Sequence, residues 1–306
     1  MPGVGSRLML LDAASLYFRA FFGVPETTTA PDGTPVNAVR GFLDMVAYLV
    51  AREQPTDLVA CMDADWRPAF RVAAVPSYKA HRLAPDGHLE IVPDTLEPQI
   101  PIIEAVLAAL GIAAVGAPGY EADDVLGTLS ADASVPTDVV TGDRDLFQVV
   151  DDVREVRVLY TGRGVRNLEI VDEKFIAKKY GIPGRAYADF ATLRGDPSDG
   201  LPGVAGIGEK SAASLIAGYG SIEGLLAALD DPRSGLAPGM RRRLADARDY
   251  LAVAPSVVRV ATDIALPEFD STRPTEPADP VALVALADRW NLDSSLNRLL
   301  NALDDR

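Results

Sequence analysis

The sequence is nearly devoid of residues that form disulfides or bind zinc. Its 306 residues include one cysteine, Cys61, and two histidines. A single cysteine excludes an intramolecular disulfide, and so few thiol and imidazole groups are too few for a typical structural zinc site. Because Cys61 lies in an apolar run that predicts a strand, we interpret it as a buried packing residue rather than a reactive thiol.

Long apolar runs are also missing. No stretch of the sequence is long enough to span a bilayer, and residues 1–7 lack the apolar segment of a signal peptide. These absences predict a cytoplasmic protein with no membrane partner. A chain of 306 residues can bury a large core, as one large domain or as two.

Basic residues are outnumbered by acids. The chain has 29 Lys and Arg against 44 Asp and Glu, a formal net charge of -15, whereas phosphate binding normally leaves a basic footprint. The charges are unevenly distributed, however. Residues 67–82 contain Arg67, Arg71, Lys79 and Arg82 and no acid, which indicates a local basic patch. Residues 241–243 are consecutive arginines, and either patch could instead be a solvated helix face.

The acids, by contrast, are grouped. Seven fall in three short clusters where a predicted strand or loop meets a predicted helix, and two more each end an apolar strand-like run. The nine acids are Asp12, Asp63, Glu121, Asp123, Asp124, Asp143, Asp145, Asp196 and Asp199. Since strand ends of an open α/β sheet face the ligand crevice, we expect these acids to converge on one pocket. Carboxylates that lie in one pocket raise one another's pKa unless cations neutralise their charge.

An all-carboxylate site indicates a hard divalent cation. Mg²⁺ and Mn²⁺ prefer oxygen ligands, and paired ions about 4 Å apart can clamp both the attacking and the leaving oxygen of a phosphodiester. The pattern therefore predicts metal-assisted hydrolysis. For any one acid taken alone, a solvated surface position is the competing interpretation.

Periodicity predicts an α/β fold with a mostly parallel central sheet flanked by helices. Strands are expected at residues 8–11, 57–62, 112–115, 138–141 and 155–160. Helices between them are expected at 37–52, 93–110 and 121–131, and later helices at 172–180, 186–194, 210–219, 240–253 and 280–303. We therefore divide the chain into an α/β core, residues 1–170, and a helical region, residues 171–306.

Two further segments carry functional hypotheses. Gly203, Gly206 and Gly208 precede Lys210 at the predicted start of a helix, where exposed N–H groups suit a phosphate oxygen. Glycines also close tight turns for packing alone, but the position directly after the last acidic cluster favours a DNA-backbone clamp. Residues 84–92 lack periodicity and are expected to form a loop, either arching over the acidic crevice or lying on the surface.

In their order along the chain, six motifs resemble those of the bacterial 5′ nuclease family, the flap endonuclease and 5′-3′ exonuclease relatives of the N-terminal domain of DNA polymerase I. The motifs are Leu10-Leu11-Asp12, Met62-Asp63-Ala64, Tyr78-Lys79-Ala80-His81-Arg82, Gly119-Tyr120-Glu121-Ala122-Asp123-Asp124, Thr141-Gly142-Asp143-Arg144-Asp145-Leu146 and Gly195-Asp196-Pro197-Ser198-Asp199-Gly200-Leu201-Pro202-Gly203-Val204. The resemblance covers about residues 7–303. One departure is Gly200, which stands where the family often has Asn.

The resemblance implies a PIN-like nuclease core with an arch at about 67–95 and a helix-three-turn-helix DNA clamp at about 195–219. It implies two or three Mg²⁺ or Mn²⁺ ions, bound by the nine acids directly or through water. The inner ligands would be Asp123, Asp143 and Asp145. A second ion would use Asp196 and Asp199, and the outer shell would comprise Asp12, Asp63 and Glu121.

Basic and clamp residues also receive roles from the resemblance. Lys79 and Arg82 would be catalytic, steering the scissile phosphate onto the metals. The DNA-binding set would be Arg71, Tyr78, Lys79, Arg82, Gly203, Gly206, Gly208 and Lys210. Backbone carbonyls of the clamp could also hold K⁺.

The implied function is structure-selective cleavage of DNA with 5′ flaps, nicks, gaps or 5′ ends, including RNA-DNA hybrids. Such 5′ flap endonuclease and 5′-3′ exonuclease activity removes RNA primers and flaps in replication and repair, beside DNA polymerase and ligase. We expect a stand-alone monomer acting at the nucleoid, with an excised polymerase domain as the alternative. An inactive DNA-junction binding protein and a PIN-type ribonuclease are the competing functions. A phosphomonoesterase is disfavoured because Asp12-Ala13-Ala14 lacks an Asp-x-Asp nucleophile.

Overall fold

A six-stranded sheet forms the centre of the protein in the computed structural model, which describes residues 5–84 and 90–304. The strands are β1 (Leu8–Asp12), β2 (Asp57–Cys61), β3 (Ala113–Val115), β4 (Thr137–Thr141), β5 (Val156–Tyr160) and β6 (Glu169–Val171). They lie in the order β3-β2-β1-β4-β5-β6, parallel except for the antiparallel pair β5 and β6. The predicted α/β fold is confirmed, although the edge strand β6 was not anticipated.

Apolar side chains on the two faces of the sheet enter two separate hydrophobic clusters. Met9 and Leu11 point into the cluster formed with α1 (Ala13–Gly23), α2 (Asn37–Glu53) and α4 (Ile100–Leu110). Leu10 points into the other, which includes α5 (Ala122–Asp132). This alternation follows from the period of two along a strand. Cys61 is buried in the second cluster as a free thiol, as expected.

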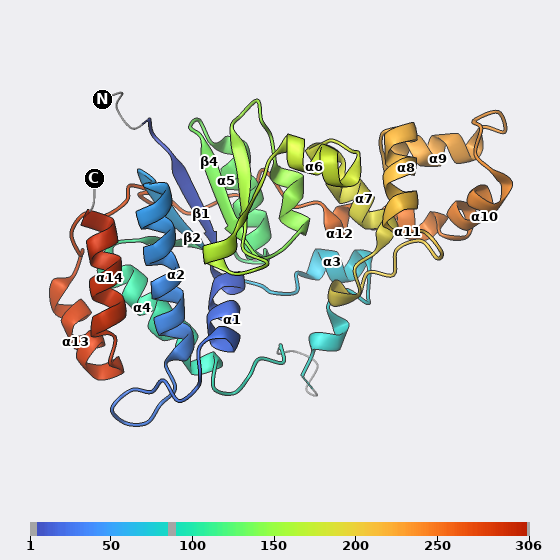
Figure 1. The fold of residues 1–306 in the computed structure, drawn as a ribbon. Coiled ribbons are helices and arrows are strands. Elements are labelled where there is room, and N and C mark those ends of the chain that lie inside the picture. The colour runs from blue at the N-terminus through green and yellow to red at the C-terminus, as the bar shows by residue number, and fades with distance from the viewer. Residues whose placement is uncertain (1–4, 85–89, 305–306) are drawn as a thin grey trace.

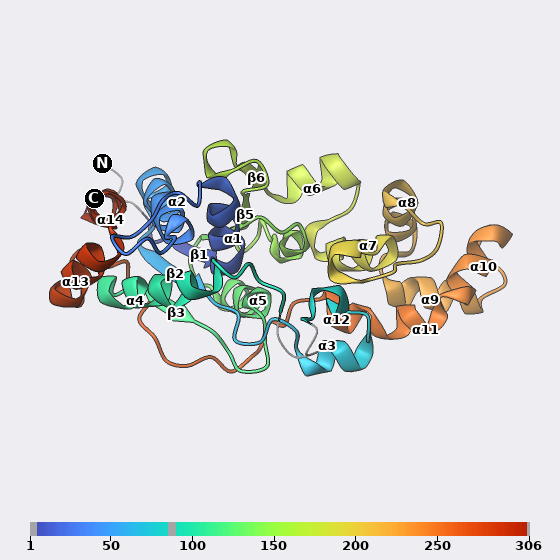
Figure 2. The same ribbon diagram turned by 90° about the horizontal axis from the view of Figure 1, so that it is seen from below.

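Helices of the second half extend the fold away from the sheet. They are α6 (Glu173–Tyr180), α7 (Tyr187–Arg194), α8 (Glu209–Tyr219), α9 (Ile222–Asp230), α10 (Pro238–Asp246), α11 (Arg248–Val253) and α12 (Pro255–Val258). Figures 1 and 2 show α8 to α11 as a lobe that projects beyond the sheet. The chain then returns, and α12 packs against α7 and against α3 (Ala69–Ala74). The single helix predicted at 240–253 is therefore two helices, α10 and α11.

The last two helices return to the first half of the chain. α13 (Pro280–Trp290) lies against α4, and α14 (Asp293–Asp304) lies against α2 (Figure 1). The prediction of one helix at 280–303 is wrong, because Asn291 adopts a left-handed conformation, φ 53°, that ends α13. Residues 280–304 thus pack on the sheet-bearing half. The domain boundary expected from the sequence, at residue 170, groups them with the helical region instead.

Within residues 5–84 and 90–304, no single helix has both the length and the apolar character needed to cross a membrane. Taken together, α8 and α9 have that length and composition, but they meet at a bend of 77°.

Candidate active site

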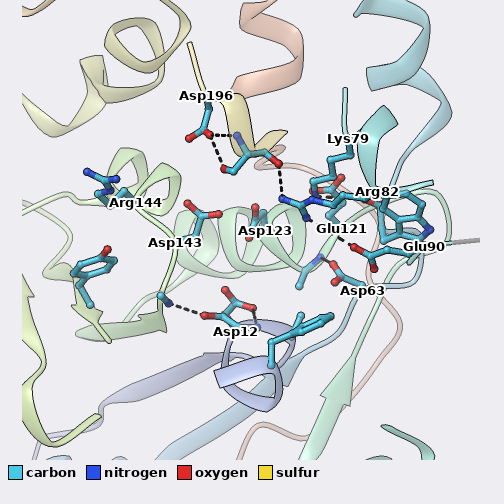
Figure 3. A pocket seen from close by; sticks show the side chains of 18 residues that line it. Asp12, Asp63, Lys79, Arg82, Glu90, Glu121, Asp123, Asp143, Arg144 and Asp196 are labelled. Atoms are coloured by element: carbon cyan, nitrogen blue, oxygen red, sulfur yellow. Dashed lines mark hydrogen bonds and ion pairs between the residues drawn. The ribbon is translucent and has the colours of Figure 1, made fainter. Parts of the chain in front are cut away.

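A pocket of about 380 Å³ opens at the carboxyl ends of the central strands (Figure 3). Asp12 is the last residue of β1, Asp63 follows β2, and Asp143 follows β4. Because these parallel strands are neighbours, their ends meet at one edge of the sheet. Six of the nine acids singled out in the sequence line the pocket: Asp12, Asp63, Glu121, Asp123, Asp143 and Asp196.

Hydrogen bonds to the backbone hold the acids at the strand ends. Asp12 caps α1, since its Oδ1 accepts a hydrogen bond from the Ser15 amide at 3.0 Å, and its Oδ2 accepts one from Thr141 Oγ1 at 2.6 Å. Asp63 Oδ1 accepts a bond from the Ala122 amide at 2.7 Å, which ties the end of β2 to the start of α5. The acids therefore stand on rigid elements rather than on free loops.

Burial makes the charged forms of these carboxylates costly. It raises the pKa of Asp12 to about 7 despite the hydrogen bonds from Thr141 and Ser15, and the charges of Asp63 and Asp143 add to the shift. Burial also raises the pKa of Asp123 and Asp145 well above the usual range, reinforced in both cases by the charge of Asp143. The site as built thus favours a neutralising cation.

Unsatisfied oxygens also fit a metal ion. One oxygen of Asp145 is buried without a hydrogen bond, and the carboxylate of Asp123 has no hydrogen-bond or ion-pair partner within the described part of the chain. The donors are carboxylates, which suit Mg²⁺ or Mn²⁺. Within the same part of the chain, no three Asp, Glu, His or Cys side chains are close enough together to hold one ion as they stand.

A basic wall faces the acids. Lys79 and Arg82 both line the pocket, on the side away from Arg144 (Figure 3). Lys79 Nζ lies 2.9 Å from Glu121 Oε2. Burial is the largest single effect on the pKa of Lys79 and would lower it, but the charges of Glu121, Asp199 and Asp123 together outweigh burial and raise the pKa, so the ammonium stays charged. Burial raises the pKa of Glu121 to about 7, although the charges of Lys79 and Arg71 lower it in part.

Asp145 and Asp199 flank the pocket rather than line it. Arg194 Nη2 lies 4.0 Å from Asp145 Oδ1 and 3.7 Å from Asp196 Oδ2, so a cation already stands between two of the acids. Asp199 forms an ion pair with Arg82 at 2.8 Å. Burial is the largest cause of the raised pKa of Asp143, and the charge of Asp199 adds to it. The Asp145 amide acts in the opposite direction, because it donates a hydrogen bond to Asp143 Oδ1 at 2.8 Å and so lowers that pKa.

Asp124 and Arg71 lie in the protein interior, and not at the metal site and the DNA surface that the sequence analysis predicted. Asp124 is fully buried, and its oxygens accept bonds from both Arg71 amino groups, at 2.7 and 2.8 Å, and from the amides of Ala261 and Glu121. Arg71 is only 2% exposed. The predictions of Asp124 as a metal ligand and of Arg71 as a DNA contact are therefore wrong. Tyr78 is likewise buried, with its hydroxyl donating to Glu121, and cannot contact DNA in this arrangement.

The glycine-rich turn divides into a buried and an exposed part. Gly203 is buried, and a Cβ there would lie 2.5 Å from the Gly195 nitrogen, so close packing explains this glycine and the predicted DNA contact is wrong. Gly206, Gly208 and Lys210 are exposed. Gly208 caps α8 without a side-chain hydrogen bond, which leaves the first amides of the helix free of a side-chain cap.

Pocket residues without a predicted role include Ser15, Trp66, Glu90 and Arg144. Ser15 was detectable, because it stands three residues after Asp12 at a helix start, and its Oγ accepts a bond from the Gly142 amide at 2.8 Å. No sequence pattern around Glu90 indicates that it belongs to the site. It reaches the site because its backbone pairs with Leu83. The loop expected at 84–92 lies largely outside the described residues, at 85–89.

An acid-lined pocket at the carboxyl edge of a parallel sheet, faced by lysine and arginine, defines a metal-dependent phosphodiesterase of the α/β class. Residues 7–181 match the family described as 5′-3′ exonuclease, N-terminal resolvase-like domain, and residues 182–280 match 5′-3′ exonuclease, C-terminal SAM fold. The chain belongs to the 5′-3′ exonuclease family, and it is a phosphodiester hydrolase. The resemblance found in the sequence is thereby confirmed.

Relatives from bacteria support the assignment. The chain is 62% identical to a 5′-3′ exonuclease of Streptomyces coelicolor over 301 residues, which is 96% of this chain and 99% of the relative. It is 52% identical to a 5′-3′ exonuclease of Mycobacterium tuberculosis, covering 98% of each. It is also 44% identical to DNA polymerase I of the same species, over 78% of this chain but 26% of the polymerase.

Solved structures share the fold at low identity. The phage T5 flap endonuclease, in a complex with DNA and metal ions, has a TM-score of 0.64 and 15% identity, covering 98% of this chain and 100% of that one. The catalytic core of Rad2 with a DNA substrate has a TM-score of 0.62 and 20% identity, covering 98% and 93%. These likenesses place the sheet and the helical lobe in one known architecture.

Proposed function

We propose that this protein is a structure-selective 5′ nuclease, with 5′ flap endonuclease and 5′-3′ exonuclease activity on DNA. Its substrates would be 5′ flaps, nicks, gaps and RNA-DNA hybrids, as in primer removal during replication and repair. The observation that carries the proposal is a single pocket that is lined by seven acids together with Lys79 and Arg82.

The acids would hold two or three Mg²⁺ or Mn²⁺ ions, partly through water. Asp123 and Asp143 are the best inner ligands, since both line the pocket and burial raises the pKa of each. Asp12 and Asp63 are fixed by backbone hydrogen bonds and would orient bound water. When bound, such ions lower the pKa of the attacking water and stabilise the leaving oxygen.

Lys79 and Arg82 would bind the scissile phosphate. Lys79 is nearly enclosed, with 11% of its side chain exposed, so its charge acts in a site of low effective dielectric. A preorganised cation of this kind stabilises the charge that develops as the phosphodiester is attacked. The expected products are a 5′-phosphate and a 3′-hydroxyl.

The helical lobe would hold the duplex. Gly206, Gly208 and Lys210 present an exposed helix start to a DNA phosphate, and Arg243 donates to the Gly206 carbonyl at 3.0 Å, adding positive charge beside it. Backbone carbonyls of this turn would also be the ligands for K⁺. The protein would then act as a monomer in the cytoplasm, at the nucleoid, with DNA polymerase and ligase as functional partners.

The test is cleavage of a 3′-end-labelled 5′-flap DNA in Mg²⁺, Mn²⁺ or EDTA by the native protein and by Asp143→Asn. We expect metal-dependent cleavage at the flap junction, lost in Asp143→Asn while DNA binding persists. The matched control is Asp288→Asn on α13, an exposed acid far along the chain from the pocket, which should cleave normally. Binding without cleavage in either metal would instead favour a junction-binding protein.

A further inference from the structure

Two segments far apart in the sequence are joined beside the pocket. Ser77 Oγ donates to the Gly200 carbonyl at 2.7 Å, across 123 residues of chain. The Lys79 amide donates to the Asp199 carbonyl at 2.9 Å, and Arg82 Nη2 donates to the Ser198 carbonyl at 2.8 Å. We call this set of contacts between residues 77–82 and 198–200 the strap. It joins the basic residues of the pocket to the loop that carries its last acids.

At position 200 of the strap, the backbone of this protein leaves no room for a Cβ. Gly200 has φ +69°, in the left-handed region, and a Cβ there would lie 2.1 Å from the Ser77 carbonyl oxygen. Since that atom is backbone, no side-chain rotation can relieve the collision, and the two segments would have to separate. The glycine is therefore required by the close approach itself and not only by the turn.

Neither side of the strap can absorb such a separation locally. The acidic loop is closed by paired backbone hydrogen bonds between Asp196 and Leu201, at 2.8 and 3.0 Å, and Asp196 Oδ1 also accepts a bond from the Ser198 amide at 2.8 Å. On the other side, Lys79 is held by its side-chain contact with Glu121 at 2.9 Å. A shift at position 200 must move the loop relative to Lys79.

We propose that Gly200 and Ser77 are positioning residues that set the spacing between Lys79 and Arg82 on one side and Asp196 and Asp199 on the other. The inference rests on the proposed function, because it assigns these four residues to one reaction. The strap holds the phosphate-binding cations and the acids of the second ion as a single unit. Neither Gly200 nor Ser77 needs to touch the substrate.

The first test compares Gly200→Ala with Gly33→Ala. Gly33 also has a positive φ, +89°, but open space around its Cβ position, so it reproduces the left-handed strain without the collision. For Gly200→Ala we expect kcat on flap DNA to fall ~tenfold or more with KM within about twofold, since small misplacements of reacting groups are costly. Gly33→Ala should keep native kcat.

Hydrogen exchange supplies a readout that needs no cleavage. The Lys79 amide is protected by its bond to Asp199, so peptides containing it should exchange faster in Gly200→Ala and at the native rate in Gly33→Ala. Unchanged exchange, native kcat in Gly200→Ala, or an equal loss of kcat in both variants would overturn the proposal. If the native protein cleaves nothing, the proposed function fails, while the exchange experiment still decides whether the strap exists.

A second pair of variants covers the case in which Gly200→Ala does not fold. Ser77→Ala removes only the hydroxyl that donates to Gly200, and Ser77→Thr retains a hydroxyl. We expect kcat to fall about threefold in Ser77→Ala, the scale of one hydrogen bond, and to recover in Ser77→Thr. Equal kcat in the two variants would contradict the role assigned to Ser77.

Discussion

The guanidinium of Arg71 binds both carboxylate oxygens of Asp124, at 2.7 and 2.8 Å, in the interior of the protein. Arg71 Nε also donates to the Val257 carbonyl at 3.0 Å, and Asp124 Oδ1 accepts from the Ala261 amide at 2.8 Å. The pair therefore joins α3, α5 and the segment that follows α11. It binds the returning chain to the sheet-bearing half next to the pocket acid Glu121, whose Oε2 lies 3.5 Å from Arg71 Nη1.

Asp124→Asn is predicted to impair folding rather than metal binding. Removing one charge from a buried pair typically costs roughly 3–5 kcal/mol, and Arg71 would keep only its longer ion-pair contact with Glu121, at 3.5 Å. The guanidinium-chloride midpoint should fall markedly, while the folded fraction at low temperature should still bind Mn²⁺. Asp143→Asn is the matched comparison, with nearly native stability and weakened Mn²⁺ binding. A stable Asp124→Asn protein that has lost Mn²⁺ binding would restore Asp124 as a ligand.

This pair also shows where sequence reasoning ends. Asp12, Asp63 and Asp143 could be placed because each ends or follows a short apolar strand, a local pattern that determines which edge of the sheet the acid meets. Asp123 and Asp124 are adjacent on one helix, where successive side chains point about 100° apart. Which of them faces the pocket depends on a partner 53 residues away, and no local pattern contains that information.

Long-range packing explains the other differences. The apolar pattern of residues 280–303 continues across the turn at Asn291, so periodicity alone predicts one helix. Placement of α14 against α2 is a contact between the two ends of the chain, which neither composition nor spacing reveals. The glycine-rich turn was located correctly, but burial of Gly203 against Gly195 is a tertiary contact that its sequence does not distinguish from exposure.

Asp123→Asn is predicted to stabilise the metal-free protein at alkaline pH. Burial and the charge of Asp143 raise the pKa of Asp123 well above its ordinary value. As pH rises above about 4, the unfolded chain loses this proton before the folded chain does, so the free energy of unfolding falls. In EDTA at pH 8 the variant should have the higher Tm, by roughly 2–4 °C per kcal/mol, and near pH 4 the difference should vanish.

Added Mn²⁺ should reverse that order at pH 8. The native protein gains stability because the ion binds the folded state only, whereas Asp123→Asn should gain much less. Scanning calorimetry over a Mn²⁺ series, with Asp288→Asn as the control, measures both effects. A lower Tm for Asp123→Asn in EDTA at pH 8 would show that the charge of Asp123 is already compensated without metal.

Lys79→Met is predicted to slow cleavage much more than it weakens DNA binding. The ammonium of Lys79 is almost enclosed beside Glu121, and loss of one preorganised charge contact typically lowers kcat by roughly 10²–10³-fold. Single-turnover cleavage and fluorescence anisotropy would separate the two effects. Lys178→Met on the exposed side of α6 is the control for charge, and an equal loss of binding and cleavage in Lys79→Met would contradict the catalytic role.

Lys210→Ala is predicted to show the opposite pattern. Lys210 is exposed in the first turn of α8, well outside the pocket, so its loss should raise the Kd for duplex-bearing flap DNA and leave kcat at saturating DNA unchanged. Because one phosphate contact disappears, the slope of log K against log salt should become shallower by about one. Lys210→Arg keeps the charge and should retain the native slope. If Lys210→Ala keeps the native slope, Lys210 does not contact DNA. The exposure of Gly206 and Gly208 would then be explained by the turn and not by a phosphate contact.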